Sequence, residues 1–199
     1  MDILLSICIG IGLSAACGFR IFVPPLVMSI AAMYGHLPLS SDFDWIGTYP
    51  ALIAFAIATA VEIGAYYIPW IDNILDAVST PTAIAVGTLI AKALLPDSDP
   101  LVHWTVAVFA GGGSAGIVQA FTGITRLSST ALTGGIGNAL VSTIEAGSSI
   151  TLSILAIVVP VFAAVLVAVL LVFILRIVVR KGWKSLLPLN ESQPSSLEQ

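Results

Sequence analysis

Apolar runs recur along the whole chain, separated by short polar or proline-containing segments. Most of these runs approach or exceed the roughly 18–20 residues that a helix needs to cross the hydrocarbon core of a bilayer. A transmembrane barrel would instead show alternating segments of about ten residues, and this sequence has none. The pattern therefore predicts an all-α fold, a polytopic membrane helix bundle.

The interruptions divide the chain into about six predicted transmembrane helices. They cover residues 3–34, 50–68, 81–95, 101–123, 127–146 and 151–179. Gly18, Arg20 and Pro24 interrupt the first segment. Because proline removes a backbone donor and clashes with the preceding turn, this segment is either one kinked helix or two half-helices that meet near Arg20. Residues 3–34 and 70–95 are each candidates for a re-entrant rather than a spanning segment.

Composition supports a membrane protein. The chain is 58% hydrophobic and only 9% charged, whereas soluble domains carry about 25% charged residues. A soluble globular domain is thereby excluded, and we expect neither nucleic-acid binding nor catalysis on soluble substrates. We expect one integral membrane domain over residues 1–184 and a disordered, polar C-terminal tail over residues 185–199.

The placement of charge predicts an orientation. Four basic residues follow the last apolar run: Arg176, Arg180, Lys181 and Lys184. Positive residues are enriched in cytoplasmic segments, so we expect a cytoplasmic C-terminus in the bacterial inner (cytoplasmic) membrane, with the N-terminus on the same side. Acidic loops without Lys or Arg suit the opposite side; they contain Asp42, Asp44, Asp97 and Asp99.

The segment over residues 120–145 is more polar than its neighbours. If it is one helix, a single face carries Gly134, Asn138, Ser142 and Glu145, because successive residues turn by about 100°. Such a face belongs inside a bundle, against protein or a water-filled cavity. The glycines of this segment would let another backbone approach closely or leave room for a permeant. The alternative is that Ser and Asn merely hydrogen-bond neighbouring helices.

Ionisable residues inside membrane segments are costly to bury and are therefore functional candidates. They are Arg20, Glu62, Asp72, Asp76, Lys92, Arg126 and Glu145. Arg20 and Arg126 are candidate counter-ions or anchors for an anionic substrate, and the two glutamates are candidate proton- or cation-responsive groups. The predicted substrate or ion path consists of Arg20, Glu62, Asp72, Asp76, Arg126, Asn138, Ser142 and Glu145. The alternative is that the charges pair and lock helices together.

The two halves of the chain show a weak internal similarity. A stretch rich in small residues, 12–18 in one half and 111–123 in the other, leads to an arginine that precedes a membrane glutamate. This pattern predicts an internal inverted repeat, as in many secondary transporters.

Motifs of established chemistry are missing from the sequence. It contains no HExxH, no Walker loop and no CxxC, and the Gly–x–Ser–x–Gly at residues 112–116 lies within a predicted membrane span and not in a nucleophile elbow, so we expect no metal and no cofactor, and an enzyme is the less favoured class. Asp72 and Asp76 lie at i and i+4, on one helix face. Together they could hold a divalent cation and a lipid phosphate, which leaves a lipid-acting enzyme as an alternative.

Three motifs carry a resemblance to a known family. They are residues 18–24 (Gly–Phe–Arg–Ile–Phe–Val–Pro); Glu62 followed by residues 68–72 (Ile–Pro–Trp–Ile–Asp) and Asp76; and Arg126 followed by residues 134–138 (Gly–Gly–Ile–Gly–Asn), Ser142 and Glu145. Over about residues 5–150 the chain resembles the uncharacterised membrane family labelled domain of unknown function 4126. The resemblance implies a compact multi-helix membrane fold and no established activity. This chain carries Tyr66–Tyr67 where that family often has Asp–Lys.

The function we expect is that of a small membrane transporter or channel-like protein, proton- or cation-coupled, with an unknown substrate. Its partners would be membrane lipids and a small solute, ion or lipid substrate. One alternative is a structural, partner-binding membrane scaffold; another is a lipid-handling protein, a flippase or a lipid-acting enzyme. Close-packing small residues also make a homo-oligomer an expectation.

Overall fold

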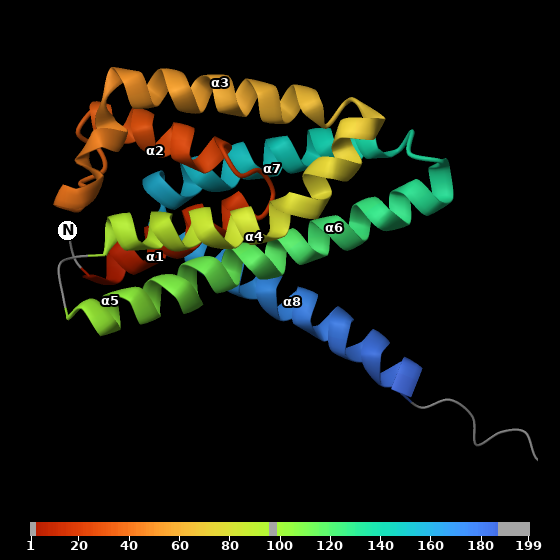
Figure 1. Ribbon diagram of the computed structural model, residues 1–199. Helices are drawn as coiled ribbons and strands as arrows, with labels where there is room; N and C mark the ends of the chain where they lie inside the picture. Colours follow the sequence, from red (N-terminus) through yellow and green to blue (C-terminus); the bar gives the residue numbers. More distant parts are fainter. Residues whose placement is uncertain (1–2, 96–98, 187–199) are drawn as a thin grey trace, which may run out of the picture.

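The protein is a bundle of helices. The computed structural model describes residues 3–95 and 99–186, and the regular elements in these two ranges are all helical (Figure 1). In chain order they are α1 (Ile3–Cys17), α2 (Val23–Met33), the 3₁₀-helix η1 (Ser41–Gly47), α3 (Tyr49–Ala65), α4 (Pro69–Leu94), α5 (Pro100–Val106), the π-helix η2 (Ala107–Gly112), α6 (Gly113–Thr133), α7 (Asn138–Val158) and α8 (Pro160–Leu186). The predicted all-α membrane bundle is confirmed.

Four stretches within the described ranges are long and apolar enough to cross a membrane. They are Ala77–Leu94, Pro100–Thr133, Asn138–Val158 and Pro160–Ile177. A fifth is added if η1 and α3, which are bent by 68° relative to each other, count as one span. Large apolar side chains such as Ile57, Val61 and Val169 are exposed on the outside, where lipid would cover them. The chain is a multi-pass membrane protein; within residues 3–95 and 99–186, four or five stretches have the length and composition of a span, against about six predicted.

The first two helices form a hairpin whose tip lies inside the bundle. Helix α1 runs antiparallel to α7, because Ser149 contacts Ala16 while Gly12 approaches Ala156. Helix α2 runs parallel to α7, because one groove is lined by the C-terminal parts of both helices. The chain therefore enters the bundle along α1 and returns along α2 to the end where it started (Figure 1). The re-entrant alternative for residues 3–34 is thus the one observed.

This hairpin places the start of α1 and the end of α8 at opposite ends of the bundle (Figure 1). We call them the N-terminal end and the C-terminal end. The N-terminal end also contains η1, with the exposed Asp42 and Asp44, and the start of α5 after Asp99. The C-terminal end contains the α3–α4 and α6–α7 connections. The expectation that both chain termini share a side was wrong, because residues 3–34 do not cross.

Two predicted helix boundaries were also wrong. Helix α4 (Pro69–Leu94) continues through Pro81 instead of restarting there, so one helix replaces the predicted break and the short helix over residues 81–95. Residues 147–149, which separate the predicted segments 127–146 and 151–179, lie inside α7. The real turn is at residues 134–137, where Gly134 and Gly135 have φ of 63° and 94°. Glycine adopts this left-handed conformation without steric cost.

Proline sets most of the helix starts. It occupies the first turn of α2, α3, α4 and α5, and Pro160 begins α8. Its fixed φ suits the first turn, where its missing N–H would have no helical partner. The predicted segment over residues 151–179 does not form one helix, because the chain breaks before Pro160, between α7 and α8.

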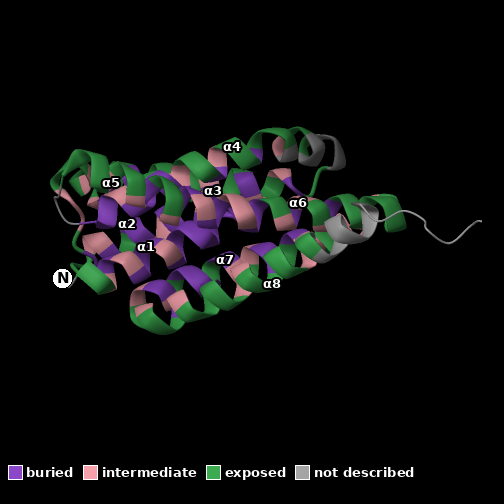
Figure 2. Ribbon diagram, turned by 90° about the horizontal axis from the view of Figure 1, so that it is seen from below, coloured by how far each residue is buried: buried purple, intermediate pink, exposed green. Residues whose placement is uncertain are grey.

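Small residues bring α1, α4 and η2 into close contact in the core. A Cβ added to Gly87 would lie 2.6 Å from the Cβ of Ala115, and one added to Gly111 would lie 2.5 Å from the Cβ of Ala91. The Ser14 hydroxyl donates to the Gly87 carbonyl at 2.7 Å. Figure 2 shows buried positions gathered on these inner helices and exposed ones along the outer faces. The hydrophobic effect does not drive helices together in lipid, so van der Waals packing through close backbone contacts of this kind takes its place.

Candidate functional site

Arg20 lies at the tip of the α1–α2 hairpin and is only 1% exposed. Its Nη2 donates to the carbonyl oxygen of Ser142 at 3.0 Å and to the hydroxyl of the same residue at 2.5 Å. The same nitrogen lies 3.4 Å from Oε2 of Glu145. Among the described residues, Nε and Nη1 of Arg20 have no hydrogen-bond partner.

Glu145 is shared between the two arginines. Nε of Arg126 donates to its Oε1 at 3.0 Å, and Nη2 of Arg126 donates to its Oε2. That second oxygen is also the one that faces Arg20. One carboxylate thus joins the hairpin tip to α6 and α7, and all three side chains are buried.

Tyr66 contacts both guanidinium groups. The Cζ atoms of Arg20 and Arg126 lie 4.0 Å and 3.8 Å from the centroid of its ring. An aromatic ring attracts a cation over its face, most strongly where water is excluded. Tyr66 follows the end of α3 and is 5% exposed, so its ring stabilises both buried charges.

Glu62 serves the backbone of the hairpin tip. Its two carboxylate oxygens accept hydrogen bonds from the N–H groups of Ile21 and Phe22, at 2.7 Å and 3.0 Å. Those N–H groups lie just before and at the start of α2, where no earlier helical turn can accept them. The carboxylate therefore satisfies backbone donors that a re-entrant segment would otherwise leave unpaired inside the membrane.

The absence of a side chain at Gly18 lets the hairpin tip pack closely against α6 inside the bundle. A Cβ at Gly18 would lie 2.5 Å from the Cβ of Val118 and 2.6 Å from the carbonyl oxygen of Ala115. The Thr122 hydroxyl donates to the Gly18 carbonyl at 3.3 Å. The end of α1 consequently rests directly on α6, and Arg20, two residues later, enters the space between α3, α6 and α7.

The structure brings five of the eight predicted path residues together: Arg20, Glu62, Arg126, Ser142 and Glu145. We call the four ionisable ones, Arg20, Glu62, Arg126 and Glu145, the charge cluster. Asn138 lies at the start of α7, nearer the C-terminal end, where its Nδ2 donates to the hydroxyl of Thr130 at 2.9 Å. The backbone of Asp72 and Asp76 lies in the first turns of α4, and their side chains lie outside the described part of the structure.

The predicted single helix over residues 120–145 does not exist, so the shared face was partly an artefact of extending one helix through a turn. Ser142 and Glu145 do share the buried face of α7. Gly134 and Gly135 serve the turn, and a Cβ on either would meet nothing within 4 Å. They therefore bring no neighbouring backbone close.

Tyr66 is the site residue that the sequence reasoning missed. The signal was available in the departure of Tyr66–Tyr67 from the Asp–Lys pair of the similar family. An aromatic pair at a helix end reads as an ordinary interfacial feature, however, because tyrosine is common at that depth. Its contact with two arginines depends on how the hairpin tip, α3 and α6 meet.

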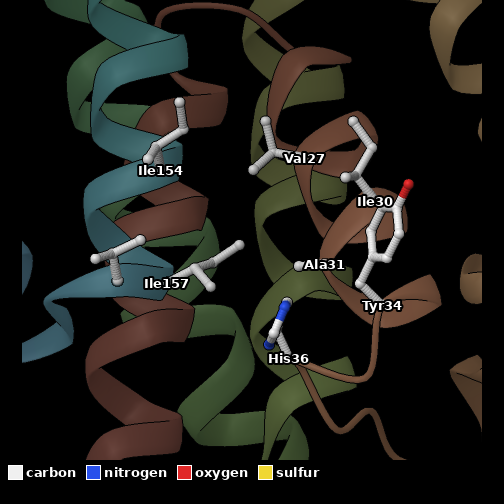
Figure 3. A pocket seen from close by; sticks show the side chains of 8 residues that line it. Val27, Ile30, Ala31, Tyr34, His36, Ile154 and Ile157 are labelled. Atoms are coloured by element: carbon white, nitrogen blue, oxygen red, sulfur yellow. The ribbon is translucent and has the colours of Figure 1, made fainter.

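A separate groove lies at the N-terminal end, between α2 and α7. Its volume is about 480 Å³, and its lining is apolar apart from Tyr34 and His36. Figure 3 shows side chains of the two helices facing each other across it, with His36 on the segment that follows α2. This groove is remote from the charge cluster, which lies toward the C-terminal end.

Metal binding has no evident place in the described residues, since no three His, Cys, Asp or Glu side chains among them lie together. The chemistry open to the charge cluster is an exchange of ion-pair partners. Glu145 holds two cations, so any change in its charge or position affects Arg20 and Arg126 at once.

Comparison with known proteins gives one match. The family model described as "Domain of unknown function (DUF4126)" matches residues 7–180. A search of curated proteins and a search of solved structures each found no match. Because the family model covers most of the sequence, the chain belongs to the family of the domain of unknown function DUF4126.

Proposed function

We propose that this protein is a small membrane transporter whose permeant passes the charge cluster. The observation that carries the proposal is the position of the cluster: four ionisable side chains, each at most 7% exposed, meet at the tip of a re-entrant helix pair. Broken helices with buried charges at their break are the usual construction of ion and substrate sites in transporters. Intramembrane charges are too costly to be common without a role.

The side chains around the cluster support an access route from the C-terminal end. Tyr67 and Thr143 hydrogen-bond through their hydroxyl groups at 2.8 Å, and Asn138 bonds Thr130 near the α6–α7 turn. These polar pairs lie between the cluster and that end of the bundle. Coupling to a proton or cation would use Glu145, whose charge controls both arginines.

The proposed location is the bacterial cytoplasmic membrane, with the C-terminus in the cytoplasm. The support is the charge asymmetry: the basic residues follow the last apolar run at the C-terminal end, whereas the exposed Asp42 and Asp44 lie at the N-terminal end. Positive residues favour the cytoplasmic side. By this orientation the charge cluster lies nearer the cytoplasm.

The test is a flux measurement on purified protein in proteoliposomes. Proton, sodium, potassium, nitrate and chloride movements are compared for the wild type, Glu145→Gln and Arg126→Ala. Asp44→Asn, an exposed acid at the far end, is the matched control and should behave as the wild type. Flux that each cluster variant abolishes or uncouples from proton movement while it remains folded supports the proposal; unchanged, equally coupled flux in both variants, or no flux in the wild type, contradicts it.

A second candidate is a structural membrane scaffold, and the mutual pairing within the cluster favours it. Glu145 joins α6, α7 and the hairpin, and Glu62 fixes the hairpin tip. On this hypothesis, Arg126→Glu and Glu145→Arg each destabilise the protein and the double variant restores thermal stability, with no ion flux in any variant. Close packing through small residues would also permit a homo-oligomer, which mass measurement in lipid nanodiscs would reveal.

A further inference from the structure

Arg20 has hydrogen-bonding capacity that the described protein does not use. Its side chain is fully buried, yet two of its three nitrogens, Nε and Nη1, have no hydrogen-bond partner there. A buried donor left unpaired is costly, and native proteins rarely tolerate it without a reason. Glu62, the other carboxylate nearby, is already committed to the backbone of Ile21 and Phe22.

The geometry of the guanidinium links these free donors to Glu145. Oxyanions are bound best by two neighbouring guanidinium nitrogens, as parallel hydrogen bonds. Nη2 belongs to both such pairs, with Nε on one edge and with Nη1 on the other. In Arg20 that shared nitrogen faces Glu145 Oε2 and Ser142. An oxyanion that docks on either edge therefore meets the Glu145 carboxylate, and the two negative charges repel.

Protonation of Glu145 removes this conflict. The charged and titratable groups that face Glu145 within the described residues are Arg20 from the hairpin tip, Arg126 from α6, and Tyr66 and Glu62 on the α3 side. A neutral Glu145 leaves both guanidinium groups short of one negative charge. One monovalent anion restores the charge that the cluster had before.

We propose, building on the transport function above, that the substrate is a small monovalent oxyanion and that it crosses together with one proton. The anion binds Arg20 through a free nitrogen and through Nη2, which exchanges one of its two hydrogen bonds to Ser142 for the anion, and the proton resides on a carboxylate oxygen of Glu145. Both are released on the other side, and Glu145 then returns to Arg20. No covalent bond to the anion forms or breaks.

This scheme makes the transport cycle electroneutral. The loaded cluster, with one anion and one proton, has the same net charge as the empty one, whatever other fixed charges surround it. A membrane potential acts on net charge movement, so it should leave the flux unchanged. A pH gradient should drive it.

The experiment uses the full-length protein in proteoliposomes with a pH-sensitive dye inside. Nitrate is the probe, because it is planar, monovalent and unable to cross as a neutral acid at neutral pH; chloride, which cannot bridge two nitrogens, is the comparison. Potassium and valinomycin set the voltage at zero or at about −100 mV. We expect an inward nitrate gradient to acidify the lumen at the same initial rate at both voltages, and chloride to act more slowly.

Two variants sharpen the result. Glu145→Gln removes the proton carrier, so nitrate should still move, now without acidification and with a rate that depends on voltage. Arg20→Lys keeps the positive charge but loses the paired donors, so the preference for nitrate over chloride should be lost. Asp44→Asn is the control and should match the wild type. If either variant fails to fold, the voltage comparison on the wild type still decides.

The outcomes separate this proposal from the transport function itself. Proton or cation flux that ignores nitrate but is abolished by Glu145→Gln keeps the transport function and overturns the anion assignment. Nitrate flux without acidification, or acidification that changes with voltage, overturns the coupling. No flux of any tested ion overturns both proposals.

Discussion

The two ends of the bundle each contain an ion pair, and the two differ in almost every respect. At the C-terminal end, Arg126 and Glu145 are 4% and 5% exposed and joined by two hydrogen bonds. At the N-terminal end, Lys92 lies 3.8 Å from Asp42, whose side chain is 77% exposed. Lys92 also lies over the rings of Phe43 and Trp104, at 5.4 Å and 4.8 Å.

The comparison shows how burial changes the contribution of an ion pair to stability. Exposed pairs gain about 0–1 kcal/mol, because water solvates either partner alone nearly as well. In a buried pair, the removal of one partner strands the other where nothing replaces it. Substitution of Asp42 should therefore have little effect on stability, whereas substitution of Glu145 removes the counter-ion of two buried arginines.

The largest expected effect is that of Glu145→Ala. It leaves Arg20 and Arg126 buried without their shared counter-ion, which should cost about 3–5 kcal/mol. In a protein of this size that loss lowers Tm by about 10 °C. Thermal unfolding in detergent, followed by tryptophan fluorescence, measures it. If Glu145→Ala and Asp42→Ala had equal Tm values, the contrast between the two ends would be refuted.

Glu62→Gln should have the next largest effect. The amide retains one acceptor, so one of the N–H groups of Ile21 and Phe22 meets an NH₂ group instead of an oxygen. An unsatisfied buried donor costs about 1–3 kcal/mol. Hydrogen exchange should accelerate at residues 18–22 more than elsewhere; uniform exchange across the chain would show that Glu62 does not hold the hairpin tip.

Tyr66→Leu tests the ring that both arginines contact. Removal of the ring should cost about 0.5–2 kcal/mol of cation–π attraction. Tyr66→Phe keeps the ring and should cost less. Equal Tm values for the Leu and Phe variants would mean that the ring face contributes nothing.

The smallest effect should come from Lys92→Ala, about 0–1 kcal/mol. Its contribution should also fall as salt is added, because exposed charges are screened over about 10 Å at 0.1 M ionic strength. Tm measured against NaCl concentration checks this: the gap between Lys92→Ala and the wild type should narrow. A gap that persists in high salt would indicate a contribution from the aromatic contacts instead.

Much of the bundle could be predicted from the sequence. Apolar runs identified the helices, and of the two alternatives left open by the interruption around Arg20, a kinked helix or two half-helices, the structure has the second. Prolines marked helix starts reliably, with Pro81 as the exception. There a helix interior tolerates proline because membrane helices find other partners for the freed backbone groups.

The arrangement of the site was only partly predictable. Four of its residues were chosen because charges are rare in lipid, and that criterion needs no geometry. The roles were not accessible in the same way: Glu62 binds backbone N–H groups, and Glu145 serves two arginines. Such roles depend on how deep the hairpin tip reaches, which follows from contacts such as Gly18 against Val118 and not from any local pattern.

The hairpin has a consequence for how the protein is assembled. Its polar groups form hydrogen bonds with residues much later in the chain: Ser14 with Gly87, Arg20 with Ser142, and Ala16 with Ser149. Synthesis begins at the N-terminus, so α1 and α2 leave the ribosome well before α7 exists. The helices that are synthesised first can therefore be the last to reach their final packing. Until α7 is present, Arg20 lacks its partners and must stay near water. A chain cut after α4 should therefore leave Arg20 without its partners on α7.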